Sequence, residues 1–142
     1  MPLINTLAAE IIDPPGLQVY SLAELPDPLP KRVGVVLPPE TNIAEFAAKM
    51  SYFETIAIEF PKFRDGRGFT LARSLRQRGY EGDIRAVGHF LPEQFLSLLA
   101  CGFSSFLTPP SHPPASFVSV LTRSRQPGQL LQLSLSRVLE TA

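Results

Sequence analysis

Apolar and polar positions in the middle of the chain follow two alternating periods. Short β-branched and apolar runs, which are typical of buried strands, recur at 33–37, 55–60, 84–88 and 104–107. Between these runs, apolar residues return every three or four positions, as on helices that cover a sheet. The strands start about 20 to 30 residues apart, which is the spacing of parallel crossover units. We therefore expect an α/β fold with four parallel strands in repeated βα units.

The three expected helices carry their own boundary signals. Asn42 precedes Glu45 by three residues at the start of the first helix, which is a capping pair. The second helix, residues 70–78, and the third, which begins at Pro92, are each followed by a glycine. Right-handed crossovers would bring the carboxyl ends of the strands to one rim, where α/β folds bind ligands. The pattern fits either a small open parallel sheet or a partial, half βα barrel.

Fifteen prolines punctuate the chain and suggest its division. An irregular N-terminal segment holds one candidate strand, residues 17–22. Near the other end, residues 117–121 fit a strand or a helix turn, and residues 130–139 mix both periods. We expect three parts: a peripheral segment at 1–31, a βα domain at 32–108, and a proline-rich linker with a C-terminal extension at 109–142.

Length, charge and cysteine content narrow the functional classes. The 142 residues suit one domain, and 13 basic against 13 acidic residues give no overall field for nucleic acid or membrane. Cys101 is the only cysteine, so no internal disulfide or thiolate-only metal cage can form. The chain start lacks a cationic signal region, and no apolar stretch is long enough to span a membrane. We expect a cytoplasmic protein.

The segment after the second strand, residues 60–69, has the composition of an anion site. Its cations attract negative charge, and its glycines let backbone amides approach a ligand. The same residues also fit a structural loop, in which Asp65 caps the next helix and the cations pair with Glu59 and Asp65. The candidate ligand-binding residues, which include one in the third strand, are Glu59, Lys62, Asp65, Gly66, Arg67, Gly68 and Arg85.

A catalytic role is left open, with Lys62, Asp65 and His89 as the candidates. Lys62 fits a Schiff-base lysine or a solvated one, and His89, at the end of the third strand, fits an acid–base group or a surface turn. Arg85 alternates with apolar residues, so an inward orientation needs a carboxylate, for which Glu59 is the candidate; a solvated edge strand is the alternative. No spacing of residues suggests a metal site, and no motif identifies a cofactor.

An ordered series of short motifs spans residues 32–107: Ala57–Phe63 with Asp65–Gly68, Ala72-Arg73 with Leu75-Arg76, Arg78-Gly79-Tyr80, Arg85–Gly88, and Cys101-Gly102-Phe103. This series resembles a bacterial family of unknown function whose members are commonly labelled probable oxidoreductases involved in sulfite reduction. The resemblance implies a partial TIM barrel and genes beside those of assimilatory sulfite reductase and sulfonucleotide reductase. Two features depart from the family pattern: His89 stands where an aspartate is usual, and a proline-rich stretch follows Thr108.

The leading hypothesis is an accessory protein of assimilatory sulfite reduction. It would bind a small anion or a reductase partner, sulfite reductase or sulfonucleotide reductase, at the rim of strand ends. One alternative is an enzyme acting on a small anionic substrate, with Lys62 or Asp65 in acid–base chemistry and Arg67 and Arg85 holding the anion. Another is a non-catalytic interaction domain that forms a homodimer. Sulfite reduction needs a redox cofactor, so the family label alone does not make this chain an enzyme.

Overall fold

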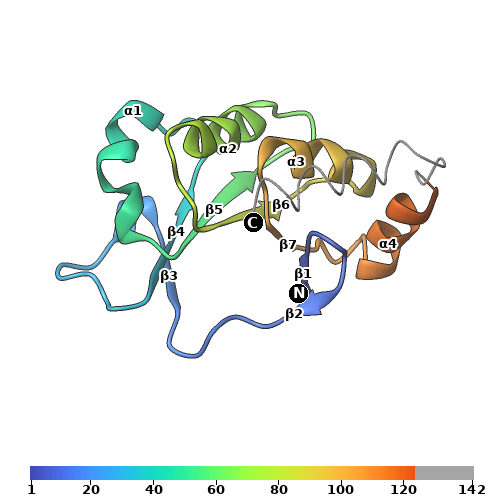
Figure 1. Ribbon diagram of the computed structural model, residues 1–142, viewed down its shortest axis with the longest axis horizontal. Helices are drawn as coiled ribbons and strands as arrows, with labels where there is room; N and C mark the ends of the chain where they lie inside the picture. The colour runs from blue at the N-terminus through green and yellow to red at the C-terminus, as the bar shows by residue number, and fades with distance from the viewer. Residues whose placement is uncertain (124–142) are drawn as a thin grey trace.

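One mixed sheet organises the part of the chain that the computed structural model describes, residues 1–123. Its seven strands lie in the order β2-β1-β7-β6-β5-β4-β3 (Figure 1). The strands are β1 (Leu3–Asn5), β2 (Glu10–Ile11), β3 (Gln18–Ser21), β4 (Val33–Leu37), β5 (Thr55–Phe60), β6 (Asp83–Gly88) and β7 (Ser105–Leu107). The α-helices are α1 (Ile43–Phe46), α2 (Arg67–Gln77), α3 (Phe95–Cys101) and α4 (Pro114–Arg123), and the 3-10 turns are η1 (Leu22–Glu24), η2 (Ala47–Tyr52) and η3 (Pro92–Gln94).

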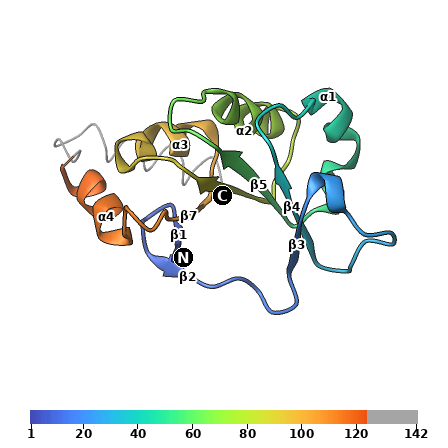
Figure 2. The ribbon, with the colours of Figure 1, turned by 180° about the vertical axis from the view of Figure 1, so that it is seen from behind.

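The four strands predicted from the apolar runs are β4 to β7, and they form the parallel centre of the sheet. Helices α1, α2 and α3 connect them and lie together on one side, here called the helix face (Figures 1 and 2). Because side chains alternate along a strand, every second residue of each strand points to this face. These are the core residues, all at most 2% exposed: Val33, Val35, Leu37, Ile56, Ile58, Phe60, Ile84, Ala86 and Phe106.

The expected sheet of four strands was too small, because the N-terminal segment adds one strand, β3, at one edge and the hairpin of β1 and β2 at the other. β3 confirms the strand expected at 17–22 and pairs in parallel with β4. At the opposite edge, β1 pairs antiparallel with β7 and β2 with β1. β1 and β2 have only three and two residues, too few to show a period of two, and the sequence pattern missed them. The division of the chain into three parts stays a prediction.

A single connection, residues 12–17, joins the two edges and is here called the strap. It runs from β2 to β3 on the side of the sheet that faces away from α1–α3, here called the second face (Figures 1 and 2). The guanidinium of Arg32 donates to the backbone oxygen of Pro15 over 3.1 Å, which fastens the strap near the start of β4. The strap therefore crosses the second face, and helices α1, α2 and α3 all lie on the opposite face.

Local signals mark most helix ends where the sequence places them, although α2 begins at Arg67, three residues before the predicted start. The Asn42 side chain accepts from the backbone of Ala44 and Glu45 at the start of α1, as a capping residue should. Gly79 and Gly102, which follow α2 and α3, have φ of 93° and 106°, a left-handed backbone that favours glycine. The first helix, α1, is only four residues long, and the chain continues as the 3-10 turn η2 after Phe46.

The segment at 117–121 forms a helix, so the helical alternative is confirmed. It belongs to α4, which buries Phe117 and Val120. Phe117 joins an aromatic cluster, with ring centroids 5.4 Å from Phe95 and 5.8 Å from Phe90. The mixed pattern at 130–139 lies outside the described residues. None of the helices within residues 1–123 has the length and apolar character needed to cross a membrane.

Candidate functional site

The loop at 61–66, here called the cationic loop, joins the carboxyl end of β5 to α2 at the predicted rim (Figure 1). Lys62, Phe63 and Arg64 are all exposed, and the Phe63 side chain keeps 41% of its surface in solvent. The Arg64 guanidinium lies 5.2 Å from the centre of the Phe63 ring, within range of a cation–π contact. Among the described residues, Lys62 and Arg64 form no salt bridge. The loop therefore presents two cations and an aromatic ring to solvent.

Two contacts hold this loop in place. The Gln94 side chain, at the start of α3, donates to the Phe63 carbonyl oxygen over 2.7 Å. Asp65 accepts from the Arg67 backbone N–H over 3.1 Å and from its guanidinium over 2.9 and 2.7 Å. The hydrogen bonds from the Arg67 side chain and backbone lower the pKa of Asp65 to about 2. Asp65 thus stays ionised and accepts from the first N–H of α2, although the N-cap position itself is Gly66; of the structural interpretation of this loop, the pairing of a cation with Asp65 is found.

The two glycines of the candidate site have different surroundings. A Cβ on Gly68 would lie 2.6 Å from Cζ of Phe60 and 3.2 Å from Cγ2 of Ile58. Gly68 is buried at this contact, so it lets α2 approach β5 closely. Around Gly66, by contrast, a Cβ would meet no atom of the described chain within 4 Å. Gly68 therefore has a packing role, whereas Gly66 lies free at the surface.

Glu59 and His89 lie at the same rim as the cationic loop. The backbone N–H of His89 donates to the Phe60 carbonyl oxygen over 2.7 Å, and the His89 side chain is exposed. Glu59 is exposed on the second face, where it stands opposite Val87 of β6. Within residues 1–123, Glu59 forms no salt bridge, so the expected pairing of loop cations with Glu59 is not found.

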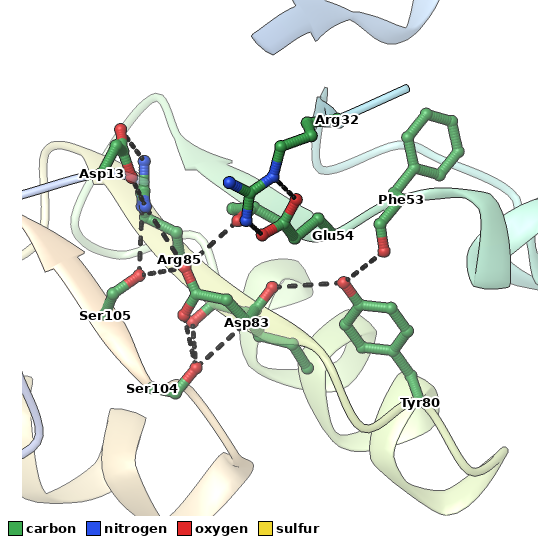
Figure 3. A network of polar contacts seen from close by, with 11 residues as sticks. Asp13, Arg32, Phe53, Glu54, Tyr80, Asp83, Arg85, Ser104 and Ser105 are labelled. Carbon is green, nitrogen blue, oxygen red and sulfur yellow. Dashed lines mark hydrogen bonds and ion pairs between the residues drawn. The ribbon is translucent and has the colours of Figure 1, made fainter. Parts of the chain in front are cut away.

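Arg85 belongs to a different site, and the expectation that Glu59 would pair with it was wrong. Its guanidinium is nine-tenths buried on the second face and donates to both oxygens of Asp13, over 2.5 and 3.2 Å (Figure 3). A further contact of 3.2 Å reaches Asp83. Glu59 cannot take this place because it stands opposite Val87, two residues further along β6. The true partner, Asp13, comes from the strap, 72 positions earlier in the chain.

Asp83 is the centre of a hydroxyl-rich network at the amino ends of β5, β6 and β7 (Figure 3). It accepts from Ser104 over 2.6 Å, from Ser105 over 2.8 Å and from Thr55 over 3.4 Å. The Ser105 hydroxyl also accepts from Nε of Arg85 over 3.1 Å. The sequence did carry a signal for this pair, because Asp83 and Arg85 are two residues apart in a strand and so share one face.

Two hollows lie on the surface of the described part of the chain away from the cationic loop, whose residues line neither of them. One, of about 600 Å³, lies beside Asp13 and Arg85 at β1, β2 and β7. The other, of about 570 Å³, lies between η3 and α4 and includes His112 and Arg123. Residues 1–123 contain no group of three His, Cys, Asp or Glu side chains placed to hold a metal ion. Cys101 is buried, and its sulfur accepts from Arg73 over 3.4 Å.

Comparison with known protein families gives one match. Residues 34–129, more than half of the chain, match the model of a family described as "Bacterial protein of unknown function (DUF934)". No curated protein and no solved structure matches the chain.

Proposed function

Since the chain belongs to this bacterial family of unknown function, we propose that it is an accessory protein that docks onto a partner through its cationic loop. The partner is a reductase of assimilatory sulfite reduction, sulfite reductase or sulfonucleotide reductase. The assignment to sulfite reduction rests on the family resemblance of the motifs in residues 32–107. The docking mode is supported by one observation: the loop exposes Lys62, Phe63 and Arg64 at the strand ends, outside the two described hollows.

An exposed aromatic ring flanked by cations suits a protein surface better than a small anion. Aromatic and arginine side chains supply much of the binding energy of interfaces, and cations steer the approach of an acidic partner. The hydrogen bond from Gln94 and the pairing of Asp65 with Arg67 already fix the loop. A loop that is ordered before binding loses little conformational entropy when it docks.

The enzyme alternative requires surroundings that these residues do not have. A Schiff-base lysine needs a dry pocket or a close cation to lower its pKa, and Lys62 is exposed. A small anion held jointly by Arg67 and Arg85 would need both guanidinium groups on one side. Arg67 begins α2 on the helix face and pairs with Asp65, whereas Arg85 points to the second face and pairs with Asp13 and Asp83.

We also propose that the sheet curls like part of a βα barrel. In a flat sheet the edge strands β2 and β3 would be separated by six interstrand spacings, about 29 Å. The strap must join Ile11 to Gln18 within seven Cα steps, which reach about 25 Å at most. The two edges therefore approach each other more closely than flatness allows, which favours curvature with the second face on the inside.

The docking proposal is tested by capture of the purified reductases on the full-length chain. We expect one reductase to be retained, and retention to weaken as the salt rises from about 0.05 to 0.5 M, because screening shortens the reach of exposed charges. Lys62→Glu with Arg64→Glu should lower the affinity at least about tenfold.

The matched control is Lys31→Glu with Lys49→Glu, which makes the same charge change at exposed positions that precede β4 and β5, at the opposite end of the sheet. Equal loss of binding in both double variants would reject the loop as the docking surface. Failure of the wild-type chain to retain either reductase would reject the proposed partner.

A further inference from the structure

The buried charge of Arg85 already has one permanent counter-ion, Asp83. Three hydroxyl groups donate to the Asp83 carboxylate, and Nη2 of Arg85 lies 3.2 Å from it. Both residues belong to β6, so their pairing is built into the sheet. A buried guanidinium needs a carboxylate partner, and this pair satisfies the requirement without any contribution from the strap.

Asp13 is a second carboxylate on the same guanidinium, and among the described residues Arg85 is its only side-chain partner. It binds Arg85 in a two-pronged arrangement, over 2.5 and 3.2 Å, yet 42% of its side chain is exposed. It lies on the strap, whose residues 12–16 are exposed throughout. An incoming carboxylate that replaced Asp13 would leave the net charge around Arg85 unchanged, and Asp13 would return to water at little cost.

The hollow beside this pair has the size and lining of a site for an amphipathic ligand. Its volume of about 600 Å³ falls within the usual range for small-molecule sites. Arg85, Asp13 and Glu10 supply the charged part of its wall, and Leu3, Ile11, Ile12 and Leu107 supply apolar surface. Ile12 is 92% exposed and Ile11 37% exposed, so a bound apolar group would cover side chains that now face water.

We propose that this hollow binds a small carboxylic acid with an apolar body, whose carboxylate takes the place of Asp13 on Arg85. The fork of the guanidinium selects a planar, two-oxygen anion, and the apolar wall selects an aliphatic or aromatic body over an inorganic anion. Asp13 then acts as a competitor within the chain, and the strap moves away from the second face when the ligand binds. This site is separate from the cationic loop and does not depend on the proposed docking.

The test uses the full-length chain and a series of linear alkanoates, acetate, butyrate, hexanoate and octanoate, in isothermal titration calorimetry. We expect the affinity to rise about fourfold for each methylene that the hollow covers. Octanoate should bind, whereas 1-octanol, which has the same body without the charge, should bind at least about tenfold more weakly. Equal affinity for octanoate and 1-octanol would overturn the proposal, because it would leave Arg85 without a role.

Two variants test whether Asp13 competes with the ligand for Arg85 and whether the apolar wall of the hollow contacts the ligand. Asp13→Ala removes the internal carboxylate and should raise octanoate affinity about tenfold or more, since a competing occupied state is lost. Glu81→Ala is the control, because Glu81 is an exposed acid outside the hollow and should leave the affinity unchanged. Ile12→Asp should lower octanoate affinity about tenfold, and it keeps the proposal testable if Asp13→Ala does not fold. Unchanged affinity in both hollow variants would overturn it.

A second copy of the chain is the competing occupant of the same apolar surface. Sedimentation of the wild type over a range of concentrations distinguishes the two cases. If the chain dimerises, Ile12→Asp prevents this, and octanoate neither binds nor shifts the equilibrium, the hollow is a self-association surface and the ligand assignment is wrong. A monomer that binds octanoate supports the proposal.

Discussion

The substitution Gly68→Ala directly tests the conclusion that Gly68 has a packing role, which Gly66 lacks. The Cβ that Gly68→Ala adds would lie 2.6 Å from Cζ and 2.7 Å from Cε1 of Phe60, and one of the two groups must move. Phe60 is fully buried, and its ring contacts those of Phe69, Phe90 and Phe103, with centroids 5.5, 6.3 and 5.8 Å away. In such a packed cluster neither the ring nor α2 can shift freely.

The expected magnitude is a balance of two terms. Overpacking of a close-packed core costs about 1 to 3 kcal/mol, whereas replacing glycine by alanine within a helix gains about 1 kcal/mol. Because the contact is under 3.0 Å and neither group can shift freely, the cost lies in the upper part of this range, about 2 to 3 kcal/mol, and the net loss for Gly68→Ala is about 1 to 2 kcal/mol of unfolding free energy. For a chain of this length, each kcal/mol lowers the melting temperature by about 3 °C. Urea unfolding and thermal melting followed by circular dichroism measure both quantities.

Gly66→Ala is the matched control for this prediction. Gly66 has φ of −77°, which any residue adopts, and open space where the Cβ would be. We expect its stability to stay within about 0.5 kcal/mol of the wild type. If Gly68→Ala is as stable as Gly66→Ala, the packing explanation fails, and the requirement for glycine at 68 would have to come from a bound ligand.

Three further predictions concern charges and hydrogen bonds. The carboxyl group of Asp65 should titrate near pH 2 by NMR, and Arg67→Ala should return the midpoint towards 3.8. Because the folded pKa is lowered, the stabilising contribution of Asp65 is present above the ordinary pKa of 3.8 and is lost as pH falls through about 2. Arg76→Ala should cost about 2 to 4 kcal/mol in urea unfolding, because this half-buried guanidinium donates to three backbone carbonyl groups, and burial lowers its pKa. Arg78→Ala, at an exposed position, should cost under about 0.5 kcal/mol, and equal losses in the two variants would contradict this view. Tyr80→Phe should cost about 1 kcal/mol, since it removes the hydrogen bond of 3.0 Å to a buried carbonyl oxygen, and a more stable variant would refute that estimate.

The parallel centre of the fold was predictable because its signals are local. The apolar runs of β4 and β5 are buried over nearly their whole length, so they stand out against the amphipathic helices between them. The stops at Gly79 and Gly102 follow from the left-handed backbone that ends a helix and that glycine adopts most easily. Each of these features is decided within about ten residues, which is the range over which a sequence pattern carries information.

The second face was not predictable, because long-range contacts determine it. Nothing near Asp13 indicates that it will meet Arg85, 72 positions later, and the strap carries no periodic pattern. For the same reason, the sequence could not show that the candidate residues belong to two separate sites. Glu59, the cationic loop and His89 share the rim because each lies at or just after the carboxyl end of a parallel strand, whereas the orientation of Arg85 depends on which carboxylate the fold brings near it.

The pairing of β1 with β7 also determines when β1 can join the sheet while the chain is being synthesised. Thr108 donates to the carbonyl oxygen of Pro2, 106 positions earlier, and Leu3 stands opposite Leu107. The residues of β1 must therefore wait until β7, about 100 residues later, has been made before they find this partner, about 5 to 20 s at ordinary rates of translation. During this interval Leu3 and Ile4, which are buried in the finished sheet, have no partner strand, so this segment keeps apolar surface exposed to water until β7 is made.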